Sequence, residues 1–111
     1  MIILASSFSL KMLDKESPRA TLDVFPVSLE DVVSFLGDLP FKSIVGHPAT
    51  ARVFSELLDV PVEVNRVSYT IKSGDTLVVG LPSGGRLPEG KILGEDEMGV
   101  MDWFIVRLRE E

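Results

Sequence analysis

The sequence predicts an α/β protein: one domain with a mostly parallel or mixed central sheet of about five strands, flanked by helices. Three observations support this prediction. Short apolar runs rich in β-branched residues alternate with amphipathic helical patterns at short intervals. The 111 residues, 45% of them hydrophobic, suffice for one modest core. No repeat or linker divides the sequence, so we expect residues 1–111 to fold as a single domain.

The first elements are two short strands and a brief helix between them. Residues 1–6 form an apolar run that is typical of a buried strand. Ser9 is placed to cap a brief helix within residues 8–13, because a serine hydroxyl accepts hydrogen bonds from the free N–H groups of a first turn. Residues 20–25 alternate as a second strand. We expect Pro26 to end this strand, since proline has no backbone N–H to donate.

Two amphipathic helices are predicted next. Ser28 is expected to cap the first, and Gly37 to end it. The second is expected to open at His47, with a proline in its first helical position, and to stop before Pro61. In both helices apolar residues recur three and four positions apart, which is typical of one buried face. They are Leu29, Val32, Val33 and Leu36 in the first helix, and Val53, Phe54, Leu57 and Leu58 in the second.

Alternating or β-branched patterns predict the other strands. Residues 73–75, with the sequence Ser-Gly-Asp, are a turn signal between two of them, so we expect the strands on either side to pair as a hairpin. Residues 82–90 contain three glycines and two prolines and are expected to form a loop of considerable backbone freedom. These predicted strands are residues 41–45, 66–72, 76–81 and 103–109.

The composition limits both compartment and partners. There is no cysteine, which excludes disulfides, thiolate metal sites and cysteine nucleophiles and favours a reducing compartment. The apolar start lacks a basic leader and is too short to cross a membrane, so we expect a cytoplasmic protein with no membrane partner. A formal net charge of −6 argues against a protein that coats duplex DNA, because that affinity comes largely from Lys and Arg.

Polar segments follow three predicted strands and are candidate ligand contacts, because open α/β sheets bind ligands beyond the carboxyl ends of their strands. They are residues 6–11, residues 46–50, and the loop that holds Arg86, Glu89 and Lys91. The first two segments are expected to open at the same edge of the sheet. Each begins a predicted helix, whose free N–H groups and partial positive charge suit a phosphate.

His47, the only histidine, is the strongest candidate for proton transfer. The field of a helix N-terminus disfavours imidazolium, whereas a bound phosphate favours it, so we expect both protonation states to be accessible near neutral pH. A general acid requires this property. A histidine that only caps the helix is the alternative that the residues alone leave open.

Two other kinds of site are disfavoured. Residues 85–91 have the spacing of a phosphate-binding P-loop, but Ile92 stands where that motif needs a Ser or Thr hydroxyl for magnesium. With one histidine and no cysteine, only carboxylates are left as metal ligands, and the acidic residues 95–97 are typical of a solvated helix start. We therefore expect metal-independent chemistry and no cofactor.

Four segments, taken together, resemble one known family. They are LASSFSLKML near the start, SIVGHPAT around His47, NRV at residues 65–67 and GRLPEGKIL at residues 85–93. In this order and spacing the chain resembles the ring nucleases of the type III anti-CRISPR family, which occur in archaeal viruses and phages and as cellular enzymes. The resemblance implies a metal-independent homodimer. It would bind cyclic tetra-adenylate, the second messenger of type III CRISPR defence, and cleave it to linear di-adenylate.

The resemblance also implies roles for individual residues. His47 resembles the family's catalytic acid in its Gly-His motif. Arg86 and Glu89 resemble the arginine and glutamate of a mobile loop that folds over the ligand, and we count both with the catalytic residues. Arg66 in the NRV segment and Ser9 resemble residues that contact the ligand.

Further ligand contacts are expected at Gly46 and Lys91, which flank the catalytic candidates. Many relatives have asparagine where this chain has Ser6, and again where it has Lys11, so contacts at these two positions are expected to be rearranged. The expected activity is cleavage of cyclic tetra-adenylate. The alternative is a binding protein: a sink that sequesters this messenger without cutting it, or a small nucleic-acid-binding regulator, which the acidic charge disfavours.

Overall fold

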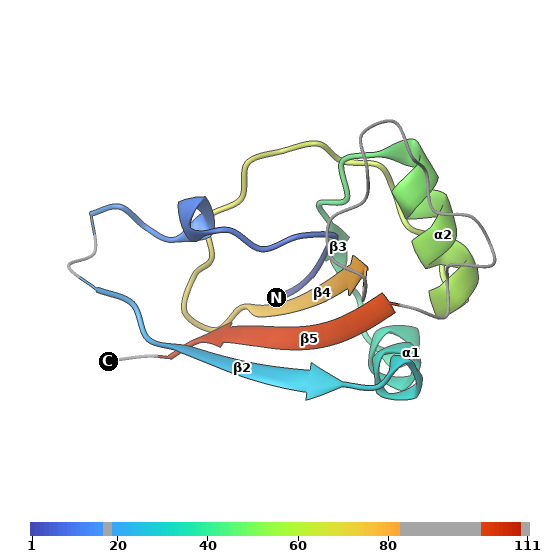
Figure 1. Cartoon of the computed structure of the whole chain (residues 1–111), viewed down its shortest axis with the longest axis horizontal. Helices are drawn as coiled ribbons and strands as arrows, with labels where there is room; N and C mark the ends of the chain where they lie inside the picture. Colours follow the sequence, from blue (N-terminus) through green and yellow to red (C-terminus); the bar gives the residue numbers. More distant parts are fainter. Residues whose placement is uncertain (17–18, 83–100, 110–111) are drawn as a thin grey trace.

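Five strands form one mixed sheet within residues 1–16, 19–82 and 101–109, the part of the chain that the computed structural model describes (Figure 1). Their order is β2-β5-β4-β1-β3. β1 lies parallel to β3 and β4, whereas β5 is antiparallel to β4 and β2. The predicted mixed α/β sheet is confirmed. The strands are β1 (Ile2–Ala5), β2 (Leu22–Val27), β3 (Lys42–Ser43), β4 (Thr76–Pro82) and β5 (Met101–Leu108).

Two α-helices of the described residues, α1 (Leu29–Asp38) and α2 (Pro48–Leu58), pack on one face of this sheet. Ser28 caps α1 as predicted: its hydroxyl accepts a hydrogen bond from the backbone N–H of Asp31 at 3.1 Å. The apolar stripes of both helices meet β1, β4 and β5 in a shared core. Among the described residues, no helix has the length and apolarity that crossing a membrane requires.

Gly37 does not end the first helix, contrary to the prediction. It lies in the last turn of α1, which continues to Asp38. The helix ends because Leu39 is extended, with φ −128° and ψ 143°, and Leu39 precedes Pro40. The ring of a proline disfavours helical backbone in the residue before it. The stop signal is therefore the proline and not the glycine.

An aromatic pair holds α2 against the sheet. The rings of Phe54 on α2 and Trp103 on β5 are both buried, with centroids 5.0 Å apart and planes inclined by 52°. Gly80 on β4 leaves room for them, since a Cβ there would lie 2.6 Å from Trp103 Cζ3 and 2.9 Å from Phe54 Cζ. Such a pair contributes about 0.5–1.5 kcal/mol beyond its buried area. The packing fixes α2 and therefore also the residue at its N-terminus.

The opposite face of the sheet is covered by a 3₁₀ helix, η1 (Leu10–Met12), and by the irregular segment 66–72. The predicted strand at 66–72 and its hairpin with β4 are wrong. β4 pairs with β1 on one side and β5 on the other, so no edge of it is left for this segment. Tyr69 and Ile71 instead pack down onto the sheet face, and the backbone N–H of Ile71 donates to the carbonyl of Met12 at 2.8 Å.

Pro26 does not end the second strand either, because β2 runs to Val27. The N–H of Arg109 donates to the carbonyl of Thr21 at 2.7 Å, so the backbone polar groups of Thr21 face the strand partner β5. In an antiparallel pair these groups alternate along the strand, so the nitrogen of Pro26, five residues on, faces the free edge. A proline in this position breaks no hydrogen bond of the sheet. It also hinders the addition of a further strand at this edge.

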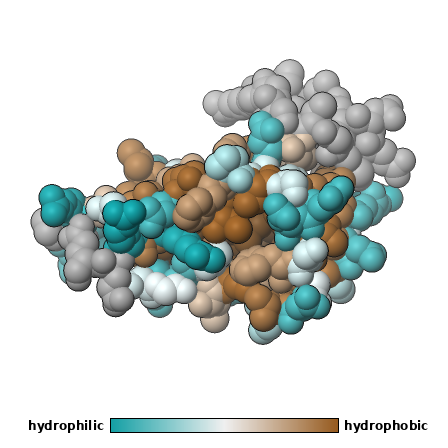
Figure 2. Space-filling model, turned by 90° about the horizontal axis from the view of Figure 1, so that it is seen from below, coloured by the Kyte–Doolittle hydropathy of each residue, from teal (hydrophilic) through white to brown (hydrophobic). Residues whose placement is uncertain are grey.

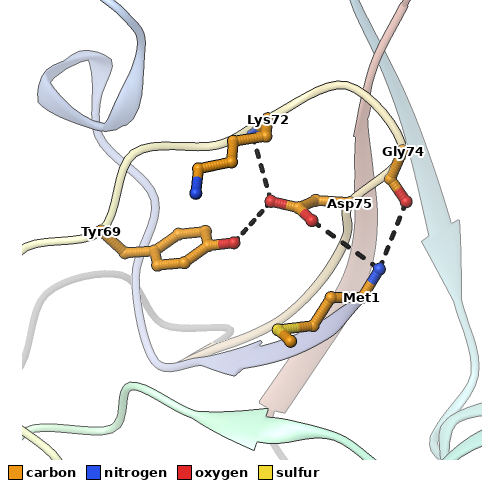
Figure 3. A network of polar contacts seen from close by, with 5 residues as sticks. All are labelled: Met1, Tyr69, Lys72, Gly74 and Asp75. Atoms are coloured by element: carbon orange, nitrogen blue, oxygen red, sulfur yellow. Dashed lines mark hydrogen bonds and ion pairs between the residues drawn. The ribbon is translucent and has the colours of Figure 1, made fainter.

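A polar network joins the beginnings of β1 and β4 (Figure 3). Asp75, 8% exposed, accepts hydrogen bonds at Oδ2 from the Tyr69 hydroxyl at 2.5 Å and from the backbone N–H of Lys72 at 3.0 Å. Its Oδ1 lies 3.7 Å from the terminal amino nitrogen of Met1, which donates to the carbonyl of Gly74 at 3.5 Å. Gly74 has φ +91°, a region that favours glycine. The predicted turn at 73–75 is thus present, but it joins an irregular segment to β4.

Part of the sheet face away from the helices is open to solvent. A hollow of about 230 Å³ there has no polar lining, and Val24 on the edge strand β2 is 54% exposed. Seen from below, apolar residues gather in the middle of the molecular surface (Figure 2). The side chains that line the hollow are Phe8, Val24, Val79, Leu81, Phe104 and Val106.

Candidate functional site

The C-terminal ends of three parallel strands lie at one edge of the sheet, as the prediction of a shared edge requires. The chain leaves β1 at Ser6 and leaves β3 towards His47, and β4 ends at the same edge because it is parallel to β1. The candidate segments 6–11 and 46–50 therefore begin at the same edge of the sheet, but the chain then turns back and carries η1 to the opposite side of the molecule from α2 (Figure 1). The third candidate segment, with Arg86, Glu89 and Lys91, and the acidic residues 95–97 lie outside the described residues.

His47 occupies the N-cap of α2, as predicted. Its backbone is extended, with φ −126° and ψ 130°, and its carbonyl accepts the hydrogen bond of Ala51 N–H at 3.0 Å. Pro48 fills the first helical position, where its missing N–H is no loss. The imidazole is exposed and, within the described part of the chain, makes no capping hydrogen bond to the helix. The imidazole is therefore accessible to solvent at this end of α2.

The N-terminus of α2 is better suited to bind an anion than the N-terminus of α1. α1 has Glu30 and Asp31 in its first turn together with the Ser28 cap, so its partial positive charge is already compensated. α2 has no acidic residue in its first turn. The N–H groups at this end can therefore attract a phosphate beside the exposed imidazole.

Arg66 lies against Gly46, the residue before His47. A Cβ on Gly46 would be 3.2 Å from Arg66 Cγ and 3.5 Å from Arg66 Cβ, so the absence of a side chain lets the stem of the arginine pass over this backbone. Arg66 itself is exposed. The structure thus brings Gly46, His47 and Arg66, three predicted site residues, to one place.

Hydrogen bonds connect the segment that carries Arg66 to the end of β3. The backbone N–H of Asn65 donates to the carbonyl of Val45 at 2.8 Å, and its side-chain Nδ2 donates to the carbonyl of Ser43 at 3.0 Å. The buried hydroxyl of Ser43 donates to the carbonyl of Glu63 at 2.6 Å and accepts from the N–H of Val45 at 3.2 Å. We call these four bonds the Ser43–Asn65 clamp.

Ser6, Ser9 and Lys11 line one cavity of about 280 Å³. The predicted helix at this point is only the three-residue η1. Ser9 caps it, accepting from the N–H of Lys11 at 3.2 Å, but three residues are too few to build up a helix dipole. His47 and Arg66 do not line this cavity. The two groups adjoin through the backbone, since Ile44 and Val67 are on the cavity wall, close in sequence to Gly46 and Arg66.

The charge on the wall of this cavity comes from Lys11. Tyr69, also on the wall, stays neutral: burial raises its pKa to about 12, and its hydrogen bond to Asp75 and the negative charge there add to the shift. The other polar side chains of the lining are hydroxyls. One ammonium among hydroxyls suits a polar, anionic ligand. Among the described residues, no three side chains of the metal-binding types come together as a metal site.

Comparison with known proteins agrees with the fold and gives the family. The sequence model of the STIV B116-like family matches residues 2–105, nearly the whole chain. The chain belongs to this family. A solved structure of the same kind, B116 of Sulfolobus turreted icosahedral virus, is similar over 96% of this chain and 97% of its own, with a TM-score of 0.74 and 28% identity.

A second relative is matched over a shorter stretch. "Uncharacterized protein 26" of Sulfolobus islandicus filamentous virus (isolate Iceland/Hveragerdi) is 33% identical over 67 residues, which is 60% of this chain. The match spans 56% of that relative's length. Both named relatives are therefore viral proteins.

The Ser43–Asn65 clamp is a feature of the site that sequence analysis does not find. Ser43 and Asn65 are separated by 22 positions, and neither has a charge or a motif that predicts their contact. Asn65 is visible in the sequence only as the first residue of the NRV segment. That segment predicts Arg66 as a ligand contact and gives no reason for the asparagine before it.

Proposed function

We propose that this chain is a metal-independent ring nuclease that binds cyclic tetra-adenylate and cleaves it into linear di-adenylate, switching off type III CRISPR signalling. The observation that carries the proposal is the exposed His47 at an anion-attracting helix N-terminus, with Arg66 beside it over Gly46. The resemblance of the four sequence segments to ring nucleases supplies the substrate. The two Sulfolobus virus relatives agree with a family that occurs in archaeal viruses.

The proposed reaction needs no protein nucleophile. A ribose 2′-oxygen attacks the adjacent phosphorus, and the bond from phosphorus to the 5′-oxygen of the next nucleotide breaks. The products are a 2′,3′-cyclic phosphate and a 5′-hydroxyl. Protonated His47 gives its proton to the departing 5′-oxygen, while the proton of the 2′-hydroxyl passes to solvent or to an acceptor side chain. General acid catalysis of this kind contributes about 10²–10⁴-fold.

Charge and orientation supply the rest of the rate enhancement. Arg66, and Arg86 from the predicted loop, would stabilise the negative charge that grows on the phosphate oxygens. Holding the ring so that the attack is in line contributes up to about 7–11 kcal/mol in favourable systems. Glu89 would orient His47, an arginine or the 2′-hydroxyl. Ser6, Ser9 and Lys11 would hold another part of the ring in their cavity.

A homodimer is part of the proposal, because a four-fold cyclic ligand on a two-fold axis presents equivalent phosphates to two copies of His47. Two cuts then give two identical halves. A second copy of the chain would cover the apolar hollow that Phe8 and the exposed Val24 line. Phe8 on the wall of the hollow lies in sequence between Ser7 and Ser9, which line the polar cavity. Light scattering at micromolar concentration is expected to give twice the monomer mass, and the monomer mass would contradict the shared site.

The test is to incubate the protein with labelled cyclic tetra-adenylate in EDTA and to resolve the products. We expect linear di-adenylate from the wild type, and a rate about 10²–10⁴-fold lower from His47→Ala. The matched control is Arg52→Ala, an exposed side chain of the same helix that pairs with Glu56 at 3.6 Å, which should leave the rate unchanged. Tight binding without products would make the protein a sink, and equal rates from wild type and His47→Ala would remove His47 from the mechanism.

A further inference from the structure

We propose that Asn65 and Ser43 are positioning residues, which fix Arg66 next to His47 before any ligand arrives. The inference rests on the proposed function for its effect on cleavage, but the ordering of Arg66 that it asserts can be measured in the free protein. Neither residue is expected to touch the substrate. They act through the Ser43–Asn65 clamp on the backbone that leads into Arg66.

The clamp is needed because the backbone around Arg66 has little regular structure to hold it. Residues 61–72 contain no helix or strand, and β3 beside them is only two residues long. Side-chain packing orders such a segment where it occurs, as at Tyr69 and Ile71, and elsewhere particular hydrogen bonds have to do so. Asn65 supplies two of them to the β3 side, and the hydroxyl of Ser43 attaches the carbonyl of Glu63 two residues earlier.

The hydrogen bonds of Asn65 act on residues next to both His47 and Arg66. Asn65 N–H is bonded to Val45, which is one residue before Gly46 and two before His47. Arg66 is the next residue after Asn65, and its stem rests on Gly46. The backbone and side-chain hydrogen bonds of Asn65 together set the relative position of the two short stretches that carry the proposed acid and the proposed phosphate ligand. An arginine side chain has many rotamers. If its stem is already ordered in the free protein, less conformational entropy is lost when the ligand binds.

The chain offers a matched control in Ser55. Its hydroxyl donates to the carbonyl of Ala51 at 2.9 Å and accepts from the N–H of Val62 at 2.9 Å, so it also attaches this irregular segment to a regular element. It attaches Val62, next to Glu63, but to α2 through Ala51 and not to the end of β3. Ser55→Ala and Ser43→Ala therefore each remove one hydroxyl with two hydrogen bonds, and only Ser43→Ala removes a bond to Val45 in the stretch that leads to His47.

The experiment is a double-mutant cycle measured by single-turnover cleavage of cyclic tetra-adenylate. We expect Asn65→Ala to lower the rate by about 10–100-fold, as misplacement by about an ångström does. In an Arg66→Ala background the same change should lower the rate by less than about twofold, because Asn65 then has nothing left to position. Ser43→Ala should follow Asn65→Ala, and Ser55→Ala should keep the wild-type rate. An equal effect of Asn65→Ala in both backgrounds would overturn the proposal, because general loss of structure would then explain it.

A second measurement separates this inference from the proposed function. The heteronuclear NOE of the Arg66 Nε–H, recorded on the free protein, reports the order of the side chain on the picosecond to nanosecond timescale. We expect a high value in the wild type and in Ser55→Ala, and a fall in Asn65→Ala. If the wild type does not cleave the ring but the NOE behaves in this way, the proposed function fails and the positioning stands. If the NOE is the same in all three proteins, the positioning fails whatever the activity.

Discussion

The parallel strands β1 and β4 begin at a closed polar network, whereas the edge at which they end carries open polar groups. At the beginning, Asp75 is nearly buried and both of its carboxylate oxygens have partners, Tyr69 and Lys72 on one side and the terminal amino group of Met1 on the other (Figure 3). At the other end, His47 and Arg66 are exposed beside a helix terminus without acidic residues.

Under the proposed function, this difference separates stability from ligand binding within one sheet. A buried carboxylate with its hydrogen bonds made is costly to disturb, because its partners would be left unsatisfied. Exposed polar side chains such as those of His47 and Arg66 contribute little to stability and stay accessible to a ligand. Substitutions at the two ends should therefore have separable effects, stability at one end and activity at the other.

Removing the guanidinium at the open end should cost activity and not stability. We expect Arg66→Ala to lower the single-turnover cleavage rate by about 10²–10³-fold, as the loss of one charge-stabilising donor does elsewhere. Its melting temperature should equal that of the wild type. Arg52→Ala, another exposed arginine, serves as the control and should change neither quantity. A cleavage rate that survives Arg66→Ala would contradict a role for this end in phosphate binding.

Removing the carboxylate at the closed end should do the reverse. We expect Asp75→Ala to lower the free energy of unfolding in urea by about 1.5–3 kcal/mol, because the Tyr69 hydroxyl and the Lys72 N–H lose a charged acceptor. The cleavage rate per folded molecule should not change. Asp38→Ala, at an exposed position of α1, is expected to alter stability by no more than about 0.5 kcal/mol. If Asp75→Ala slowed cleavage in fully folded protein, the two ends would be coupled.

A methyl group at Gly46 tests how closely Arg66 must approach. The added Cβ would meet Arg66 Cγ at 3.2 Å, so the arginine has to shift. We expect Gly46→Ala to lower the cleavage rate by about tenfold with little effect on the melting temperature. Gly37→Ala in α1 is the control, since a Cβ there meets no atom within 4 Å, and it should raise stability by about 0.5–1 kcal/mol. Unchanged cleavage by Gly46→Ala would mean that the contact is incidental.

The closed end should also give a pH dependence of stability at alkaline pH. The pKa of Tyr69 is raised from 10.0 to about 12, first by burial and then by Asp75. A phenol whose pKa is raised by folding stabilises the native state fully below pH 10, and this contribution is lost as the pH rises from 10 to about 12. Urea midpoints measured across this range should fall more steeply for the wild type than for Tyr69→Phe. Parallel curves would show that Tyr69 does not titrate abnormally.

Local signals in the sequence predict much of the fold and one part of the site. Ser28 and His47 stand at helix starts as predicted, because capping depends on a few consecutive residues. The strand predicted at 66–72 is wrong because alternation reports which side chains are buried and not which strand lies alongside. Pro26 is misread for a similar reason, since its effect depends on whether its nitrogen faces β5 or the free edge.

Contacts between distant residues account for what the sequence does not predict. The Ser43–Asn65 clamp and the Asp75 network each join positions whose proximity depends on the completed sheet. Arg66 is predicted only through the resemblance of its segment to a family, and we attribute its place over Gly46 to the clamp. Tyr69 is read from the sequence as part of a strand, and its burial against the sheet face gives it a different role.

If His47 protonates the departing 5′-oxygen, the loss of its imidazole should matter only for a leaving group that needs a proton. A cyclic tetra-adenylate with sulfur in place of the bridging 5′-oxygen at the scissile positions has a leaving group that needs no proton. If His47 is the general acid, His47→Ala should cleave the sulfur-substituted ring at nearly the wild-type rate while it stays about 10²–10⁴-fold slower on the oxygen ring. An equal deficit of His47→Ala on both rings would contradict the account.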